Sequence, residues 1–344
     1  MNKQDLKDFF LYNEYGRLPS FENVEIYYEK IDSFGNALHN VTRDDFRVHL
    51  KRNERFTSFG FDLFLPRKPK GIFLFLCNRP VGVISKKEID PNRDLKSSFY
   101  PVEMITERGY GCLAFLTSEV AEDKKGFRFG MNSLFPDVDH AKGDSYGTLL
   151  LWAKAFSLII DFLKRNERTK NLPLATVGHS RGGKTSLLAG VLDERIDLVI
   201  SSCAGCSGDA EQSNYHKGAE TIEVITKAFP YWFCPNYKQY QKKPLPFNQS
   251  DFLSLLAPRL LYTSSKSEDL WADPRGEFET LLKLNKAYEE HGKIGFCPEK
   301  PFAMDEEMVS HTGSIAHHHL HGIHDLDERD WKLYMDYWDE KIRQ

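Results

Sequence analysis

Residues 174–190 have the sequence LATVGHSRGGKTSLLAG, and this stretch decides the fold. Its first four residues are an apolar run typical of a buried strand, and the residues after Gly183 favour a helix. Between them lies a Gly-x-Ser-x-Gly pattern centred on Ser180, which in a strand–turn–helix context holds the serine in a strained turn and projects its hydroxyl above the sheet. The stretch therefore predicts that Ser180 is a nucleophile. A helix start capped by a serine is the alternative, but it would not need both glycines.

Short apolar runs and amphipathic stretches alternate along the rest of the chain, which is the pattern of a mainly parallel sheet covered by helices. Strands are predicted over Phe61–Leu65, Ile72–Cys77, Cys112–Leu116, Leu174–Val177, Leu198–Ser202 and Arg259–Thr263, and helices over Leu149–Leu163, Phe278–Glu290 and from about Asp327. Together with the serine turn, this order predicts an α/β-hydrolase fold, a three-layer sandwich with a mainly parallel central sheet flanked by helices.

Length and composition favour one large globular unit. The chain has 344 residues, of which 41% are hydrophobic and 28% are charged, and no linker or repeat divides it. We expect a single domain over residues 1–344, with an N-terminal segment to about Asn40 that wraps around it. The net charge of −4 comes from interspersed acids and bases, so neither nucleic acid nor an anionic membrane is an expected partner.

The N-terminus and the cysteines add expectations about compartment and redox chemistry. The N-terminus is polar, and no stretch approaches the roughly 20 apolar residues of a membrane span. As written, the sequence predicts a cytoplasmic protein, or a secreted or periplasmic one if a leader has been removed. Cys203 and Cys206 form a Cys-x-x-Cys pair, which without a second pair is weak evidence for metal or redox work.

The serine turn also predicts half of an oxyanion hole. The backbone N–H of Arg181 is expected at a helix N-terminus, where developing negative charge is stabilised. The guanidinium of Arg181 either adds to this or forms a surface salt bridge, and spacing alone does not separate the two. The other half is expected in the turn after the Ile72–Cys77 strand, where the residues are Asn78-Arg79-Pro80.

The acid of a Ser–acid–His triad is expected after a late strand. The predicted strand Arg259–Thr263 is followed by Glu268, Asp269 and Asp273. Asp269 is the predicted acid because it lies in the turn itself, whereas Asp273 precedes Pro274 at the start of the next helix. Glu268 remains the adjacent alternative.

The base is expected near the C-terminus, where six histidines are candidates: His311, His317, His318, His319, His321 and His324. His324 is predicted because it lies one loop before the last helix, from which it can reach the serine turn. The cluster from His317 to His321 is an alternative metal site. No carboxylate lies at ligand spacing, and three consecutive histidines cannot all point one way, so a loop is favoured and neither metal nor cofactor is expected.

Several motifs, taken together, resemble one known family. They are Tyr15-Gly-Arg-Leu-Pro19, Arg108-Gly-Tyr-Gly111, Asp123-Lys-Lys-Gly-Phe-Arg128, Gly178-His-Ser-Arg-Gly-Gly-Lys184, Phe229-Pro-Tyr-Trp-Phe-Cys234, Leu256-Ala-Pro-Arg259, Glu268-Asp-Leu-Trp-Ala-Asp-Pro274 and His324-Asp-Leu326 with Asp330-Trp331. The chain is similar to the glucuronoyl esterases of carbohydrate esterase family 15 and to their bacterial acetylxylan-esterase-like relatives.

The resemblance implies hydrolysis of an ester on the carboxyl group of a uronic acid, typically a 4-O-methyl-glucuronate that links xylan to an alcohol. It implies an acyl-enzyme on Ser180, with His324 as the base, Arg181 at the oxyanion and no metal. It also implies that Lys184, Trp271 and Glu220 hold the sugar. The expected partner is a small-molecule or oligosaccharide ester.

Two departures from the family keep alternatives open. Fungal members carry the triad acid as Glu directly after the strand that ends at Ser202, where this chain has Cys203, so the duty falls to Asp269. Two arginines often precede Gly-Glu-Thr in the family, whereas this chain has Asn214-Tyr-His-Lys217 before Ala219-Glu-Thr221. The alternatives are an esterase for acetylated sugars and a non-catalytic carbohydrate-binding relative.

Overall fold

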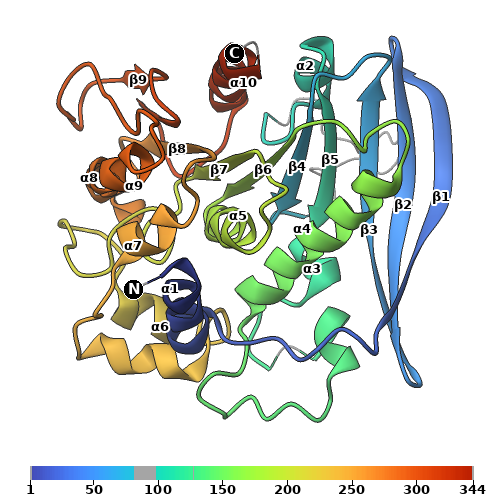
Figure 1. Cartoon of the computed structure of the whole chain (residues 1–344), viewed down its shortest axis with the longest axis horizontal. Coiled ribbons are helices and arrows are strands. Elements are labelled where there is room, and N and C mark those ends of the chain that lie inside the picture. The colour runs from blue at the N-terminus through green and yellow to red at the C-terminus, as the bar shows by residue number, and fades with distance from the viewer. Residues whose placement is uncertain (1, 81–97, 127, 343–344) are drawn as a thin grey trace.

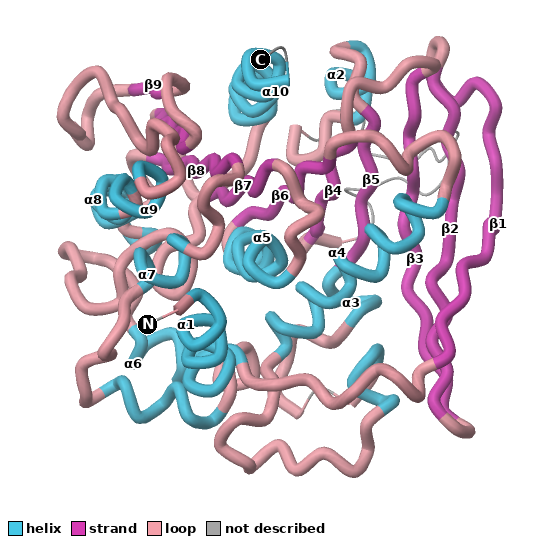
Figure 2. The backbone as a smooth tube through the Cα atoms, in the orientation of Figure 1, coloured by secondary structure: helices cyan, strands magenta, loops and turns pink. Residues whose placement is uncertain are grey.

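One sheet of ten strands runs through the molecule (Figures 1 and 2). The computed structural model describes residues 2–80, 98–126 and 128–342; Phe127, part of one family motif, lies outside the described residues. The strands are β1 (Glu25–Leu38), β2 (Val41–Arg52), β3 (Arg55–Pro66), β4 (Ile72–Cys77), β5 (Gly111–Leu116), β6 (Leu174–His179), β7 (Leu198–Ser202), β8 (Leu260–Lys266), β9 (Met308–Ser310) and β10 (Ile315–Leu320). Their order across the sheet is β1-β2-β3-β5-β4-β6-β7-β8-β10-β9. Strands β5, β4, β6, β7, β8 and β10 pair in parallel, and the edges are antiparallel.

Helices cover both faces of this sheet. They are α1 (Lys3–Phe10), α2 (Val102–Glu107), α3 (Thr117–Val120), α4 (Thr148–Arg165), α5 (Arg181–Leu192), α6 (Ile222–Ala228), α7 (Gln249–Ser254), α8 (Pro274–Lys283), α9 (Asn285–Glu289) and α10 (Glu328–Ile342). In Figure 1, α4 and α5 lie on one side of the parallel strands, and α2 and α10 lie on the other. The predicted three-layer sandwich with a mainly parallel sheet is confirmed.

Two apolar cores lie on opposite faces of the sheet, because successive side chains of a strand point to opposite faces. On β4, Ile72, Leu74 and Leu76 join the core that contains α4 and α5. Phe73 and Phe75 join the core that contains α10. All six residues of β4 are buried, and such a strand reads as an unbroken apolar run in the sequence.

The N-terminal part of the chain differs from the prediction. The segment expected to wrap the domain as far as Asn40 includes β1, which pairs with β2 along the edge of the sheet. Neither strand was predicted, because both carry many charged residues on an exposed face, including the pair Lys30 and Asp44. In Figure 1, α1 and β1 lie at opposite sides of the molecule, so the stretch between them crosses it. Only the residues before Glu25 therefore wrap the sheet.

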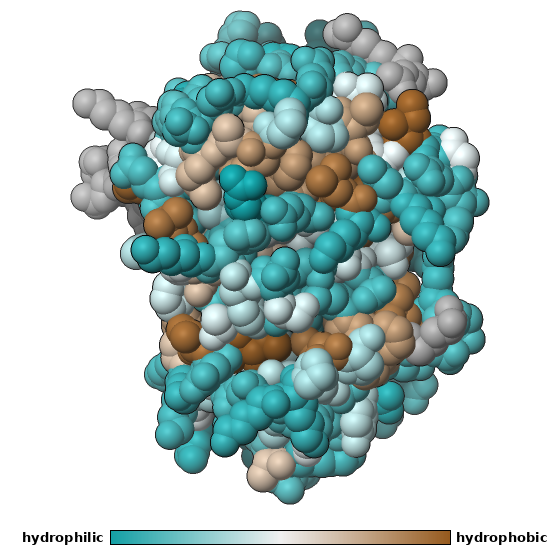
Figure 3. Space-filling view, turned by 90° about the vertical axis from the view of Figure 1, so that its left-hand side faces the viewer, coloured by the Kyte–Doolittle hydropathy of each residue, from teal (hydrophilic) through white to brown (hydrophobic). Residues whose placement is uncertain are grey.

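In the part of the chain that the structure describes, none of the helices combines the length and the apolar composition needed to cross a bilayer. The face shown in Figure 3 is mostly hydrophilic, with separate hydrophobic patches.

Candidate active site

Ser180 occupies a strained turn between β6 and α5. Its backbone angles, φ 57° and ψ −123°, lie outside the regions that residues other than glycine usually adopt. A Cβ on Gly178 would lie 1.9 Å from the carbonyl oxygen of Gly182, and one on Gly182 would lie 3.2 Å from that of Leu76. The turn therefore needs glycine at the first position and has little room at the second. The hydroxyl of Ser180 makes no capping hydrogen bond to α5, so the structure does not support the helix-cap interpretation.

Asp269 and His324 meet beside this turn. Nδ1–H of His324 donates a hydrogen bond to Oδ2 of Asp269 over 2.5 Å. Because a carboxylate only accepts, this contact places the ring proton on Nδ1 and leaves Nε2 as an acceptor. Asp269 is 5% exposed. A cavity of about 340 Å³, called here the serine cavity, is lined by Ser180, Asp269 and His324 among others.

The two alternative acids lie outside the serine cavity. Asp273 caps α8 by accepting the backbone N–H of Gly276, and it also contacts His216, through the ring over 2.8 Å and through the backbone N–H over 3.3 Å. Glu268 is exposed on the turn. Neither lines the serine cavity, so Asp269 is the carboxylate that the geometry favours.

The three residues expected to hold a sugar form one linked group in the wall of the serine cavity. The ammonium of Lys184 donates to Oε1 of Glu220 over 2.6 Å, and the indole N–H of Trp271 donates to Oε2 of the same carboxylate over 2.9 Å. Burial raises the pKa of Glu220, while Lys184 and Trp271 act against that rise. Lys184 is 2% exposed and Trp271 is 45% exposed. The group thus combines a fixed buried charge pair with an indole that faces solvent.

The loop after β7 supports this group with residues that the sequence did not single out. The ammonium of Lys184 also donates to the carbonyl oxygens of Ala204 and Cys206. Between them, the N–H of Gly205 donates to Asp209 and to Glu277, each over 3.0 Å. Burial and the neighbouring Asp209 raise the pKa of Glu277 well above its usual value. Two acids that are far apart in the sequence therefore fix the loop that holds Lys184.

Arg181 forms the salt bridge that the sequence left open as one of its two roles. Its guanidinium forms an ion pair with Asp123 and lies 4.9 Å from the ring centroid of Trp232. Asp123 also accepts the indole N–H of Trp232 over 2.7 Å. Arg181, Trp232 and Phe229 all line the serine cavity. Among the described residues, the buried Nε of Arg181 has no hydrogen-bond partner, which leaves one donor for a bound molecule.

The structure describes only part of the turn that was expected to supply the second half of the oxyanion hole. Neither Asn78 nor Arg79 lines the serine cavity, and the chain after Pro80 lies outside the described residues as far as residue 97. Arg79 forms an ion pair over 2.5 Å with Asp325, the residue after His324. It therefore helps to hold the loop of the predicted base.

Three residues of the histidine cluster lie on a buried strand, so the prediction of a loop there was wrong, whereas His321 follows the strand and is exposed. His317, His318 and His319 are fully buried on β10, which pairs with β8. Their rings contact polar groups around them: Thr263 and Ser265 for His317, Tyr262 and Asp330 for His318, and Ser265 and the carbonyl oxygen of Met304 for His319. Burial lowers the pKa of all three rings. They read as polar in the sequence, but neighbouring groups satisfy each ring inside the core.

A buried ionic network joins β10 to the loop of His324. Asp330 accepts from His318 over 2.7 Å and from Lys266 over 2.9 Å. Burial opposes the charge of Asp330, but His318 and Lys266 prevail and lower its pKa to about 2. Lys266 also reaches Asp327 over 3.2 Å. The network thus anchors both ends of the segment from 320 to 327 that carries the predicted base.

The cysteine pair is divided between the serine cavity and the loop that holds Lys184. Cys203 and Cys206 are free and buried, and burial raises the pKa of both thiols. Cys203 lines the serine cavity beside Asp269 and His324, and ligand atoms of these three residues lie within 4.8 Å of one another. The carbonyl oxygen of Cys206 accepts from the ammonium of Lys184.

A mostly parallel sheet, a serine in the turn after a central strand and a buried aspartate bonded to a histidine beside it define a protein of the α/β-hydrolase class. Within this class the chain belongs to the glucuronoyl esterase family. The family model described as "Glucuronyl esterase, fungi" matches residues 98–292, more than half of the chain. The resemblance drawn from the motifs is confirmed.

Curated relatives match this chain over part of their length. A carbohydrate esterase from an unknown prokaryotic organism is 32% identical over 270 residues, which cover 77% of this chain and 61% of that protein. The 4-O-methyl-glucuronoyl methylesterase 1 of Phanerochaete chrysosporium is 27% identical over 206 residues, which cover 57% of this chain and 42% of that protein. The chain therefore spans less than two thirds of the length of these relatives.

Solved structures match almost the whole chain. A promiscuous esterase of carbohydrate esterase family 15 from a marine bacterial metagenome has a TM-score of 0.85 and 26% identity, and the match covers 98% of this chain and 90% of that one. A glucuronoyl esterase from Solibacter usitatus has a TM-score of 0.87 and 25% identity, with coverage of 98% and 91%.

Proposed function

We propose that this protein is a serine carboxylester hydrolase that cleaves glucuronoyl esters, with a 4-O-methyl-glucuronoyl ester as the preferred substrate. The observation that carries the proposal is the bond between Asp269 and His324 at the cavity that Ser180 also lines. The relatives named 4-O-methyl-glucuronoyl methylesterase support the choice of ester.

The proposed chemistry proceeds through an acyl-enzyme. Oγ of Ser180 attacks the ester carbonyl while Nε2 of His324 takes its proton, and the same proton then passes to the departing alcohol. Asp269 holds the imidazole in the required tautomer and stabilises its charged form. A water molecule, deprotonated by His324, attacks the acyl group, and the uronic acid leaves while Ser180 regains its proton. The backbone N–H of Arg181 and its unpartnered Nε are the proposed donors to the oxyanion.

The sugar ring is proposed to lie against Trp271, because an indole that is half exposed offers an apolar face for a pyranose. Lys184 and Glu220 supply a donor and an acceptor for ring hydroxyls at fixed positions. Their bond to each other and to Trp271 means that this arrangement exists before a substrate enters. No metal and no cofactor take part in the proposed mechanism.

The altered segment Asn214–Lys217 before Glu220 contributes no residue to the lining of the serine cavity, which supports the choice of a uronate ester. His216 contacts Asp273 over 2.8 Å and does not line the serine cavity. A specific observation still favours a second substrate class, since one structural relative is described as a promiscuous esterase. Acetyl esters of sugars are therefore the second candidate.

The test compares benzyl glucuronate, methyl glucuronate and an acetylated xylo-oligosaccharide as substrates, with Ser180→Ala as the matched control. We expect release of glucuronic acid with the highest kcat/KM for the glucuronate esters, and loss of that release in Ser180→Ala. A higher kcat/KM for the acetyl ester would replace the first candidate by the second. No turnover of any ester by the folded wild-type protein would leave only the non-catalytic carbohydrate-binding interpretation.

A further inference from the structure

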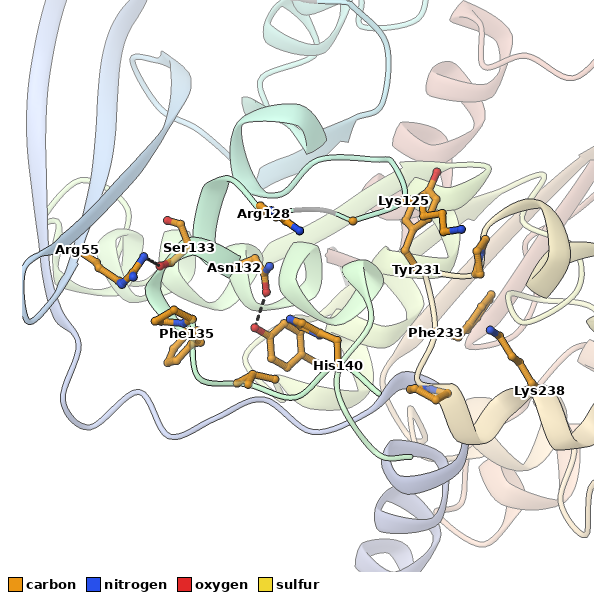
Figure 4. A pocket seen from close by; sticks show the side chains of 16 residues that line it. Arg55, Lys125, Arg128, Asn132, Ser133, Phe135, His140, Tyr231, Phe233 and Lys238 are labelled. Carbon is orange, nitrogen blue, oxygen red and sulfur yellow. Dashed lines mark hydrogen bonds between the residues drawn. The ribbon is translucent and has the colours of Figure 1, made fainter. Parts of the chain in front are cut away.

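A larger cavity, of about 710 Å³, lies near the serine cavity and plays no part in the proposed chemistry. Figure 4 shows its side chains, which come from the segments 125–146 and 230–238 and from the start of β3. Arg55, Lys125, Arg128 and Lys238 line it, and we call it the basic cavity. No aspartate or glutamate is among the residues that line it.

The four cations of the basic cavity are exposed and little neutralised. Within the described parts of the chain, Lys125, Arg128 and Lys238 form no ion pair, and the guanidinium of Arg55 donates only to the carbonyl oxygen of Ser133, over 3.3 Å. Glu122 is held by Lys124 and by the backbone N–H of Arg128. Asp137 and Asp139 are exposed and alternate with lining residues of the segment 136–140, but they do not line the cavity themselves. The lining therefore carries an excess of positive charge in a chain whose net charge is −4. An anion is therefore the ligand that the charges favour.

The floor of the basic cavity is aromatic and polar. Phe135, Tyr146 and Phe233 are buried there, and the hydroxyl of Tyr146 donates to Oδ1 of Asn132 over 2.6 Å (Figure 4). Tyr231 adds a partly exposed ring. Aromatic faces suit the apolar side of a sugar ring, and fixed polar groups suit its hydroxyls. Cations at the rim with rings at the floor match a sugar that carries negative charge.

The segment 229–233 lines both cavities, and a second segment that lines the basic cavity contacts Arg181 of the serine cavity. Asp123 pairs with Arg181 at the serine cavity, and Lys125, two residues later, lines the basic cavity. Trp232 lines the serine cavity, while its neighbours Tyr231 and Phe233 line the basic cavity. The hydroxyl of Tyr231 donates to the backbone carbonyl oxygen of Asp123 over 2.9 Å, which joins the two segments. A carbohydrate chain with its ester at Ser180 thus has a second, positively charged site along the same wall.

We propose that the basic cavity binds acidic sugar residues of the chain that carries the scissile ester, so that the protein recognises an anionic oligosaccharide and not a lone ester. The role in catalysis rests on the proposed esterase function, whereas the binding itself does not. The shared chemistry is an anionic group on a sugar, either a carboxylate or a sulfate. Arg55, Lys125, Arg128 and Lys238 pair with these groups, and the partly exposed ring of Tyr231 takes the face of a sugar ring.

The test measures binding to the full-length Ser180→Ala protein by titration calorimetry, so that no ligand is consumed. The probes are an oligogalacturonate, a sulfated oligosaccharide of similar length, a neutral xylo-oligosaccharide and a single-stranded oligonucleotide. We expect the oligogalacturonate or the sulfated probe to bind at least about tenfold more tightly than the neutral one, a difference of about 1.4 kcal/mol. The tighter of the two anionic sugars identifies the charged group. An oligonucleotide that binds as tightly as either would overturn the proposal in favour of a general polyanion site.

A matched pair of charge reversals locates the binding. Lys125→Glu with Lys238→Glu alters the basic cavity, and Lys68→Glu with Lys286→Glu makes the same change of charge at exposed positions that line neither cavity. We expect the first variant to lose at least about tenfold in affinity and the second to keep it. Equal affinity of the two variants, with melting temperatures like that of the parent, would reject the proposal. Binding by a protein that hydrolyses no ester would refute the proposed function alone, and hydrolysis without such binding would refute this inference alone.

Discussion

The serine cavity and the basic cavity handle charge in opposite ways. In the serine cavity each charged group has a partner, and Lys184, Glu220 and Asp269 are buried. The pairs are Lys184 with Glu220, His324 with Asp269 and Arg181 with Asp123. In the basic cavity the cations are exposed, and no acid lines the walls. Buried and paired groups keep their positions before a substrate arrives, which suits bond cleavage. Exposed cations attract an anion from a distance but hold it loosely and lose strength in salt.

Among the tests of this comparison, we expect the largest effect from the substitution Asp269→Asn in the serine cavity. The amide cannot act as the charged acceptor that fixes Nδ1–H of His324, so we expect kcat for a glucuronate ester to fall by about 10⁴-fold. Glu268→Gln is the matched control, because Glu268 is exposed and does not line the serine cavity. Steady-state kinetics of both variants check the prediction. An equal loss of kcat in Glu268→Gln would show that catalysis depends on the turn as a whole and not on the carboxylate of Asp269.

The buried pair of Lys184 and Glu220 should be the next most sensitive feature. Lys184→Met leaves Glu220 buried without its cation, and the expected loss of unfolding free energy is about 3–5 kcal/mol. Lys184→Met combined with Glu220→Gln should regain part of that loss, because no buried charge remains. Urea unfolding of the wild type, both single variants and the double variant completes the cycle. Additive losses would mean that the two side chains act independently.

Glu14 provides a pH test of a buried acid on the same side of the molecule as Lys184. Burial raises its pKa from 4.5 to about 8, although Gln212 donates to it over 2.8 Å. Because the folded state keeps this proton longer, the group's contribution to stability is complete below pH 4.5 and is lost as pH rises toward 8. The slope is at most about 1.4 kcal/mol per pH unit. Glu14→Gln should flatten that decline in urea unfolding between these limits, and an unchanged slope would exclude Glu14 as its source.

A change of salt concentration should have the smallest effect, and it should affect binding at the basic cavity more than hydrolysis at the serine cavity. Between about 50 mM and about 500 mM NaCl, affinity for an acidic oligosaccharide should fall by about tenfold, because exposed charges are screened. Hydrolysis of benzyl glucuronate should change by less than about twofold, because the charges around Ser180 are paired at close range. Calorimetry and kinetics in the same buffers check both. If affinity and hydrolysis fell by the same factor, the two cavities would not differ in how they handle charge.

The features that the sequence predicted well are those that leave a local pattern. The fully buried strand β4 appears as an unbroken apolar run and β7 as a short apolar run followed by two serines, and both were predicted with the bounds that they have in the structure. The turn at Ser180 was predictable because the close approach of Gly178 to Gly182 excludes any other residue at the first glycine. Asp269 was predicted from its place after a strand, and the structure brings it to His324.

The features that the sequence missed depend on tertiary contacts. β10 was read as a loop because three histidines look polar, and only the partners supplied by β8 and α10 allow them to be buried. The basic cavity was not predicted: Lys125 and Arg128 belong to a family motif with no basic role assigned to it, and Arg55 and Lys238 are far from them in the chain. A net charge of −4 therefore hid a local cluster of the opposite sign.

The central claim is that Ser180 is activated by His324, and labelling with a fluorophosphonate tests it most directly. The probe should modify the wild-type protein at one site, and peptide mapping should place the adduct on Ser180. In His324→Ala the same adduct should form far more slowly, because no base accepts the proton of the hydroxyl. An adduct on another residue, or an equal rate of labelling in the two folded proteins, would contradict the account.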